Sequence, residues 1–374
     1  MVCPSQSSIF AEQLQSVENG GHLMIQRVAV ENFRCFQSLE VEGLKRVNLI
    51  VGKNSSGKSA FMEALFLSSS SNAPNNAFQM RAIRKAGAGY QVPGDELALR
   101  SIWEDLFFDF DTGKKIHIHL RGTEGDQRQL WIAFREPTLQ GSPSGKALEN
   151  VTAFPQIVFT WKRGGSRDIV IKPTVTPTGL DTHHAAIDFF PMIWFNPNGA
   201  DAPDVTARRY SELSKRKLAQ PIVEAIRGEF DFIEDLSIEF HSGLPMLFAT
   251  VKGKPQKVPI GLVSDGIQRL IAILLGIAYY KNGAVLIDQL EDGFYFDHFP
   301  SIWKVIYSFS VRYNTQLFVS THSDECLSAV QDTLKANSGD FQLLRAERND
   351  KTCSIRQFDG DTLLSAIQQK VPFR

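Results

Sequence analysis

Apolar-rich segments predict two or three strands within residues 24–51. Residues 24–30 and 36–41 mix apolar and polar side chains, whereas residues 47–51 are almost wholly apolar. A short continuous apolar run is typical of a fully buried strand. After these strands we expect a helix at 60–70, and then residues 71–90 as a loop followed by a short basic helix, Gln79 to Lys85.

Between residues 91 and 195 the hydrophobic pattern changes to an alternation of period two. Gly, Asp and Pro residues separate the alternating segments, as they do at turns between strands. Such a series predicts an antiparallel β-rich section beside the other elements. The predicted strands are residues 116–120, 129–134, 157–161 and 168–171.

The second half of the chain predicts helices and buried strands in alternation. A charged helix is expected over residues 204–228 with Asp204 as its N-cap, and two strands are expected within 235–260. Apolar strands that alternate with helices are typical of an α/β fold. The remaining predictions are helices at 267–280 and near 298–313, strands at 284–288 and 316–320, and a strand pair within 341–359.

The charges of the 204–228 helix allow two interpretations. Arg208, Arg209 and Lys215 belong to a run that is either a solvated helical face or a surface for DNA or a protein partner. The net charge of the whole chain is −1, so no overall basic field indicates nucleic-acid binding. Nucleic acid therefore stays a partner that the sequence permits without indicating it.

Composition places the chain among soluble globular proteins. It has 374 residues, of which 43% are hydrophobic and 22% charged, and no apolar run reaches transmembrane length. Residues 1–23 lack the pattern of a signal peptide, so a flexible leader and a cytoplasmic location without membrane contact are expected. The cysteines do not form a C-x-x-C pair, which argues against a zinc site or a disulfide framework. They are Cys3, Cys35, Cys326 and Cys353.

Residues 52–59 carry the motif G-x-x-x-x-G-K-[ST] between a buried strand and a helix. The two glycines let backbone N–H groups turn toward phosphate oxygens, and the positive end of the following helix lies at the same place. The lysine adds a positive charge, and the final serine hydroxyl can ligate Mg²⁺. The motif predicts a P-loop whose nucleotide-binding residues are Asn54, Ser55, Ser56, Gly57, Lys58 and Ser59.

Three later segments fit a nucleotide site of this kind. Asp288 ends a buried strand, where a carboxylate is costly unless it is paired or near a metal, so it is expected to hold the water shell of Mg²⁺. The residues Ser264, Asp265 and Gly266 open an apolar helix and would present a hydroxyl and N–H groups to a γ-phosphate. His322 follows a second apolar strand and is a candidate sensor of the γ-phosphate.

In this order, the segments resemble the ABC-type ATPase head: P-loop, inserted arm, Ser-Gly signature, Walker B aspartate and histidine switch. More closely they resemble the SMC-like ATP-binding proteins of the overcoming-lysogenization-defect (OLD) group, which are common in bacterial anti-phage systems. The resemblance covers residues 24–374, weakly across 91–200. It rests on residues 30–36, 52–59, 262–269, 286–293 and 320–323.

The resemblance implies the fold and the partners of the chain. The fold would be an α/β P-loop fold of ABC/SMC-head type, with a mixed central sheet, flanking helices, an antiparallel β subdomain and a short helical arm. ATP and Mg²⁺ would lie between two copies in a homodimer or larger homo-oligomer. The implied segments are a leader at 1–23, an N-terminal ATPase lobe at 24–90, a β-rich section at 91–200, a helical arm with return strands at 201–260 and a C-terminal lobe at 261–374.

The same resemblance implies two further site residues. Arg34 would reach the nucleotide phosphates from the loop after the first strand. Gln79 is a candidate for the Q-loop residue that links Mg²⁺ to the arm, although an exposed Gln on a surface is the alternative.

Gln289 departs from the pattern, because relatives carry Glu there to polarise the attacking water. An amide can position water but cannot accept its proton. Three explanations are open. The glutamine could be a substitution that traps the ATP-bound dimer, the chain could be a naturally slow ATPase, or Glu291 could act in its place.

The leading hypothesis for function is an ATPase, converting ATP and water to ADP and phosphate, that switches between a closed and an open dimer. OLD nucleases carry a Toprim domain after the ATPase, and too little chain follows His322 for one. A nuclease or toxin effector is therefore expected on a separate protein. The alternatives are an ATP-dependent scaffold without meaningful turnover and a head that tethers or repairs DNA.

Overall fold

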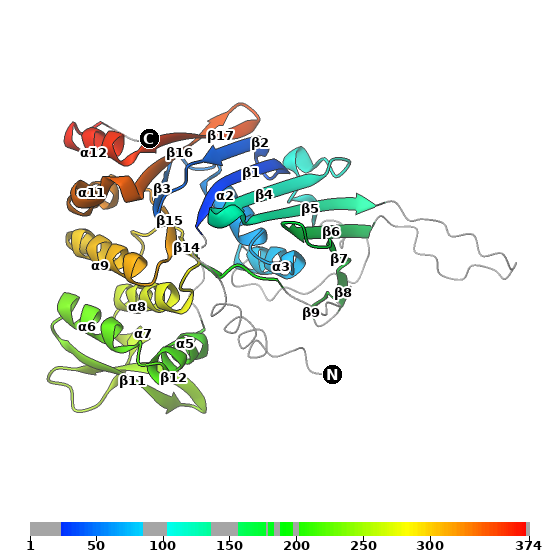
Figure 1. Cartoon of the computed structure of the whole chain (residues 1–374). Coiled ribbons are helices and arrows are strands. Elements are labelled where there is room, and N and C mark those ends of the chain that lie inside the picture. Colours follow the sequence, from blue (N-terminus) through cyan, green and yellow to red (C-terminus); the bar gives the residue numbers. More distant parts are fainter. Residues whose placement is uncertain are drawn as a thin grey trace, which may run out of the picture.

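The computed structural model describes residues 24–84, 103–135, 156–176, 179–182, 188–196 and 202–371. The predicted leader at 1–23 and the predicted helix end at Lys85 lie outside these ranges. The described strands form one mixed and one antiparallel six-stranded sheet and two smaller sheets (Figure 1). No helix within the described ranges combines the length and the apolar character that crossing a membrane requires.

The mixed sheet has the order β10-β14-β15-β3-β16-β17. Its first five strands are parallel, and β17 pairs antiparallel with β16. The P-loop strand β3 thus lies in the interior of the sheet between β15 and β16. The bounds are β3 Val47–Val51, β10 Met192–Phe195, β14 Ala284–Ile287, β15 Gln316–Ser320, β16 Phe341–Asn349 and β17 Thr352–Asp359.

The antiparallel sheet has the order β2-β1-β4-β5-β6-β7 and confirms the β-rich section predicted from period-two alternation. Along β4, Ile116, Ile118 and Leu120 are buried and the residues between them are partly exposed. The bounds are β1 Ile25–Phe33, β2 Phe36–Glu42, β4 Ile116–Gly122, β5 Gln127–Arg135, β6 Gln156–Arg163 and β7 Ile169–Ile171. A small separate pair is β8 Thr174–Thr176 with β9 Gly179–Asp181.

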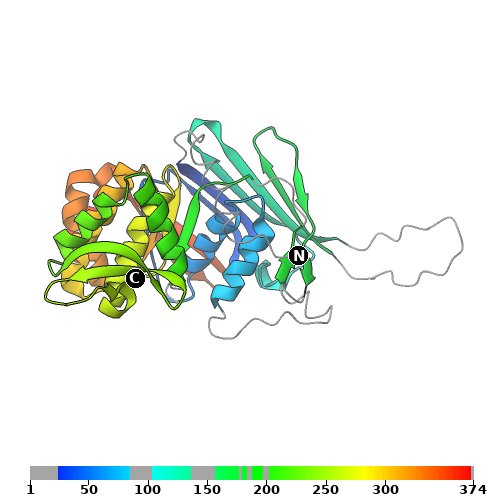
Figure 2. The same cartoon turned by 90° about the horizontal axis from the view of Figure 1, so that it is seen from below.

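Both faces of the mixed sheet are covered, which explains why its strands read as continuous apolar runs. On β3, Leu49 joins one hydrophobic core and Ile50 joins the other. The first core contains the helices of the C-terminal half, and the second contains α2 and the inner face of the antiparallel sheet. Figure 2 shows α2 (Lys58–Leu67) and α3 (Ala73–Arg84) between that sheet and the C-terminal half.

A small subdomain supplies the predicted helical arm and return strands. The strands β11 (Ile233–His241), β12 (Leu244–Val251) and β13 (Val258–Pro259) form an antiparallel sheet on which α5 and α6 pack. The remaining helices follow in the C-terminal half. They are α7 Ile260–Val263, α8 Asp265–Tyr279, α9 Phe299–Arg312, α10 Asp324–Ser328, α11 Gln331–Asn337 and α12 Gly360–Gln368, with 3₁₀ turns η1 Phe108–Phe110, η2 Thr123–Gly125, η3 Phe296–His298 and η4 Ser338–Asp340.

The helix expected over 204–228 is two helices, α5 (Pro203–Lys215) and α6 (Gln220–Glu229). The prediction of one helix was wrong because Pro221 fits only the first turn of a helix, so a new helix begins there. The N-cap of α5 is Ala202 instead of Asp204, whose carboxylate accepts from Arg208 at 2.8 Å. Arg209 is buried, so this part of the charged run is not a solvated face.

The helix α3 begins earlier than expected. Residues 73–78 were predicted to be loop because they contain Pro74 and two asparagines, yet they form its first turns. A proline in the first turn costs no hydrogen bond, since that N–H has no partner within the helix. The overall prediction of a mixed central sheet with flanking helices, an antiparallel β section and a short arm is confirmed.

Candidate nucleotide-binding site

The P-loop connects β3 to α2, and its shape depends on Gly57. This residue has φ of 104°, a left-handed conformation that glycine adopts without strain. A Cβ at Gly57 would lie 3.0 Å from the ring of Phe36 and 3.1 Å from the Sγ atom of Cys35. The loop is therefore pressed against the turn between β1 and β2, and only glycine fits at this point.

Two buried polar side chains lie inside the loop. The Lys58 ammonium donates to the carbonyl oxygens of Gly52 at 2.7 Å and Lys53 at 2.9 Å. The hydroxyl of Ser56 is buried and has no hydrogen-bond partner among the described residues. A buried unpaired hydroxyl costs free energy. Phosphate oxygens at the N-terminus of α2 would accept from both groups, so the loop fits the β and γ phosphates of a nucleotide.

Asp288 lies directly after β14 and is held next to the P-loop serine. Its Oδ2 atom accepts from the Ser59 hydroxyl at 3.2 Å, and its Oδ1 atom accepts from the hydroxyl of Ser320 at the end of β15. Only 5% of Asp288 is exposed. The structure thus brings together two residues that the sequence predicted separately as Mg²⁺ ligands.

This donor set fits Mg²⁺ bound with a nucleotide. Among the described residues, no group of three or more His, Cys, Asp and Glu side chains could hold a metal by itself. Mg²⁺ usually takes one or two protein oxygens and completes its octahedron with phosphates and water. Ser59 and Asp288 would supply those protein oxygens, and the ion would neutralise phosphate charge there.

Gln289 occupies a strained turn that a second residue stabilises. Its φ is 54°, and its N–H donates to the Ser320 hydroxyl at 2.9 Å. The Nη2 atom of Arg269 donates to the carbonyl oxygens of Asp288 and Gln289, both at 2.8 Å. Burial lowers the pKa of Arg269, and the nearby carboxylates of Asp292, Glu291 and Asp288 oppose this shift.

Arg269 contacts the predicted site, although the sequence indicated no role for it. It lies in the segment 262–269, on which the family resemblance rests. A signal was present, since an arginine in an apolar helix needs a buried partner. The sequence did not reveal that this partner is the backbone beside the predicted metal ligand.

Glu291 and His322 lie together. The backbone N–H of His322 donates to the Glu291 Oε1 atom at 2.6 Å, whereas the Oε2 atom is buried without a hydrogen-bond partner in the described part of the chain. Burial raises the pKa of Asp292; Glu291 and Asp288 act in the same direction, and Arg269 and His322 against it. The turn after β14 therefore concentrates carboxylates beside the predicted phosphate sensor.

The Ser-Gly segment packs against that same turn. Ser264 is the extended N-cap of α8, and Asp265 is exposed in the first turn. A methyl group on Gly266 would overlap the carbonyl oxygen of Gly293, so only glycine permits this close approach. Apolar side chains are exposed on both sides of the contact. They are Leu262 (78%), Tyr295 (61%) and Phe296 (53%).

Two of the predicted site residues lie apart from these contacts. The guanidinium of Arg34 forms ion pairs with Glu63 and Asp105, both at 3.0 Å. The side chain of Gln79 is exposed on α3. Their roles at the phosphates and at Mg²⁺ stay predictions.

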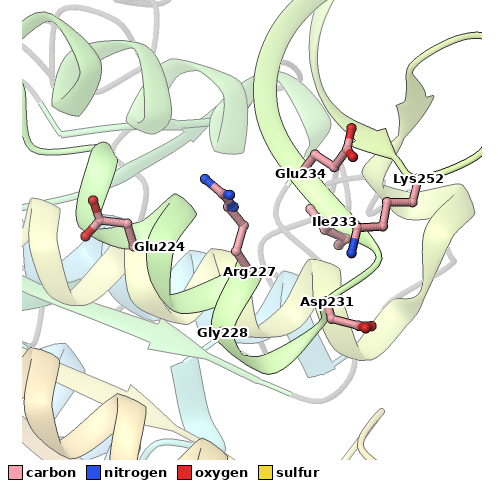
Figure 3. A pocket seen from close by; sticks show the side chains of 7 residues that line it. All are labelled: Glu224, Arg227, Gly228, Asp231, Ile233, Glu234 and Lys252. Carbon is pink, nitrogen blue, oxygen red and sulfur yellow. The ribbon is translucent and has the colours of Figure 1, made fainter.

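A separate hollow of about 440 Å³ lies between α6 and the start of β11. Figure 3 shows Glu224 and Arg227 on the α6 side and Glu234 and Lys252 on the strand side. It shares no residue with the P-loop, with Asp288 or with the Ser-Gly segment. It is therefore not the predicted nucleotide site.

Segments in both halves of the chain match families of ATPase domains. Residues 24–137 match a family described as "AAA ATPase domain". Residues 175–328 match a family described as "AAA domain, putative AbiEii toxin, Type IV TA system". The first match contains the P-loop, and the second contains the Ser-Gly segment, Asp288 and His322.

Two curated proteins are similar in sequence. An "ATP/GTP phosphatase" of Helicobacter pylori is 21% identical over 371 residues, which cover 91% of this chain and 97% of that protein. "Structural maintenance of chromosomes protein 6B" of Arabidopsis thaliana is 34% identical over 109 residues, covering 29% of this chain and only 10% of that protein.

Solved structures with partial similarity include heads of SMC proteins. One from Pyrococcus furiosus has a TM-score of 0.46 at 11% identity and covers 94% of this chain and 100% of that one. One from Thermotoga maritima has a TM-score of 0.42 at 11% identity and covers 90% of this chain and 99% of that one. Together with the P-loop and the Ser59–Asp288 pair, the family matches support a P-loop ATPase of the AAA class.

Proposed function

We propose that the chain is an Mg-ATP-dependent switch, in which nucleotide binding closes a dimer of two copies and release or hydrolysis opens it. The observation that carries this proposal is the packing of Gly266 on Gly293. It ties the Ser-Gly segment to the turn that follows the metal ligand Asp288. Exposed apolar residues flank this contact, as expected of a surface that meets another protein.

The proposed chemistry assigns a step to each group. Lys58 and the N–H groups of the P-loop bind the phosphates, and Ser59 with Asp288 holds Mg²⁺. Gln289 positions the attacking water without accepting its proton, so hydrolysis is slow. His322 contacts the γ-phosphate, and the second copy presents its own Ser-Gly segment to the same phosphate. The closed state is favoured because the γ-phosphate makes these contacts only there.

The closed dimer would control a separate effector, a nuclease or a toxin, in a bacterial defence system of the OLD-like kind. The description of the second matched family, which names a type IV toxin–antitoxin system, supports this part of the proposal. An ATP-dependent scaffold is the second candidate, and Gln289 favours it because an amide at the general-base position limits turnover.

The test is light scattering after size-exclusion chromatography, with and without Mg-ATP. It compares the chain with Gln289→Glu. Lys58→Ala is the control, because it lacks the positive charge that binds the phosphates. We expect Mg-ATP to double the mass of the chain, the Glu variant to lose the dimer as it releases phosphate, and the control to stay monomeric. If Mg-ATP does not change the mass of any of the three proteins, the switch is contradicted. A stable ATP dimer without phosphate release from Gln289→Glu would favour the scaffold.

A further inference from the structure

Two cysteines that are far apart in the sequence meet behind the P-loop. Cys35 lies in the turn between β1 and β2, and Cys353 lies near the start of β17. The backbone N–H of Cys353 donates to the carbonyl oxygen of Cys35 at 2.9 Å. Cys353 is buried and Cys35 is partly exposed. The pair therefore has one member that solvent can reach and one that it cannot.

The two side chains converge on Gly57 of the P-loop. A Cβ on this glycine would lie 3.1 Å from the Sγ atom of Cys35 and 3.1 Å from the Cβ atom of Cys353. The Cys35 sulfur and the Cys353 side chain thus lie next to the same glycine. The Sγ atom of Cys353 lies 3.9 Å from the carbonyl oxygen of Ser55. The pair thus forms part of the wall against which the phosphate-binding loop rests.

Both the contact and the backbone pairing suit a covalent bond. A disulfide needs Cα atoms about 4.4–6.8 Å apart, and residues on hydrogen-bonded neighbouring segments lie in this range. We propose that Cys35 and Cys353 are a redox pair that a peroxide converts into a disulfide. The disulfide would shift the side chains against which Gly57 of the P-loop rests.

The reaction balances with hydrogen peroxide as the oxidant. The Cys35 sulfur attacks one peroxide oxygen, which gives a sulfenic acid and one water. The Cys353 sulfur then displaces the sulfenic hydroxyl as a second water and forms the S–S bond. Two thiols and one peroxide thus give one disulfide and two waters, and a dithiol reductant restores both thiols by exchange.

The disulfide would move the wall relative to Gly57. Bonded sulfurs are about 2.05 Å apart, which is well inside the distance of two thiols in contact. At least one sulfur must therefore shift, although both segments already press on the glycine. This consequence rests on the proposed nucleotide binding. We expect oxidation to weaken ATP binding about tenfold, corresponding to the loss of roughly one charge-assisted hydrogen bond to phosphate.

The rate of oxidation should rise with pH. Burial raises the pKa of the Cys35 thiol to about 12, with the Cys353 thiol acting in the same direction and Arg348 opposing it. Below this pKa the reactive thiolate increases about tenfold for each pH unit. The pair should therefore be stable in mildly acidic buffer and oxidise measurably faster in alkaline buffer.

The experiment treats the full chain with hydrogen peroxide and measures intact mass and peptides without reduction. We expect the loss of two hydrogen atoms, a peptide that links Cys35 to Cys353, and reversal by dithiothreitol. ATP affinity is measured on the same samples. Cys326→Ser is the matched control, because Cys326 is also buried with its pKa raised to about 12. It should oxidise like the parent chain, whereas Cys35→Ser and Cys353→Ser should not form the link.

The ATP affinity tests the effect on the P-loop, and the linked peptide tests the redox pair. A linked peptide with unchanged ATP affinity would refute the effect on the P-loop. Sulfinic acid at Cys35, or a link to another cysteine, would refute the redox pair itself. The link is measured by mass in the parent chain. The redox pair is therefore tested even if a serine variant misfolds or if the chain does not bind ATP.

Discussion

Arg269 is a partly buried cation in a helix that is otherwise largely apolar. Its Nη2 atom donates to the carbonyl oxygens of Gln289 and of Asp288, the proposed metal ligand. The left-handed φ of Gln289 is unfavourable for a residue with a side chain, so an external bond is needed to hold it. Arg269 and the Ser320 hydroxyl thus hold the backbone at position 289 together.

Arg269→Ala should impair hydrolysis more than binding. In the background of Gln289→Glu, we expect phosphate release to fall about 10–100-fold, as it does when the outer partners of metal ligands are removed. ATP affinity should stay within about twofold of the parent, because the phosphate contacts come from the P-loop. Phosphate-release kinetics and calorimetric titration measure the two effects. Gln268→Ala on the same helix is the control, and an equal loss of hydrolysis in both variants would contradict the role of Arg269.

Site residues that belong to a short sequence motif could be predicted. Contacts between residues that are far apart in the sequence could not. The P-loop and Asp288 were found because loop and strand motifs fix their surroundings within a few residues. The contact of Glu291 with the N–H of His322 depends on two strands lying side by side, which the pattern along either strand does not reveal. The meeting of Cys35 and Cys353 was missed for the same reason, although scattered spacing had argued against a disulfide framework.

At the scale of elements, α8 and the turn after β14 approach each other backbone to backbone. Gly266 opens α8, and the carbonyl oxygen of Gly293 occupies the space that a side chain would need. Because the contact is between two backbone segments, no flexible side chain can move aside. The Ser-Gly segment and the turn that follows Asp288 are therefore tightly packed.

Gly266→Ala should therefore destabilise the chain, whereas Gly261→Ala should not. We expect the first variant to lose about 1–3 kcal/mol of unfolding free energy, which is typical of overpacking. At Gly261, an added methyl group would meet only the end of the Gln268 side chain at 2.9 Å, which can rotate away. Denaturant unfolding of both variants measures the difference. Equal unfolding free energies of the two variants would show that the turn after β14 moves aside to accommodate the added methyl group.

Element boundaries were hardest to predict where proline or short length decided them. Pro74 and Pro221 both occupy the first turn of a helix, although the first was read as loop and the second as helix interior. The short helices α10 and α11 gave no signal of their own, because too few residues show a helical period. Strands β3, β14 and β15 were correct within a residue, since burial on both faces makes them continuously apolar.

At the scale of the whole molecule, the mixed sheet separates two cores and carries the predicted nucleotide-binding residues at the ends of its parallel strands. β3 leads into the P-loop, β14 into Asp288 and β15 into His322. The ends of neighbouring parallel strands meet at one edge, which is where ligands bind in open α/β sheets. In the proposed function, one copy thus supplies the P-loop and the metal ligands from the ends of a single sheet.

A second copy would complete the site through the surface around the Ser-Gly segment. Leu262 is 78% exposed there, although an isolated chain gains nothing from presenting a large apolar side chain to water. Leu262→Glu should therefore leave folding and ATP affinity unchanged and weaken the Mg-ATP-dependent dimer by about 2 kcal/mol or more, as at an interface hot spot. Phe240→Glu is the matched control, because Phe240 is 79% exposed at the end of β11, outside this surface. Sedimentation with Mg-ATP compares the two variants. If Phe240→Glu disrupts the dimer and Leu262→Glu does not, the copies meet through the small subdomain, and ATP cannot be sandwiched between the P-loop and the Ser-Gly segment.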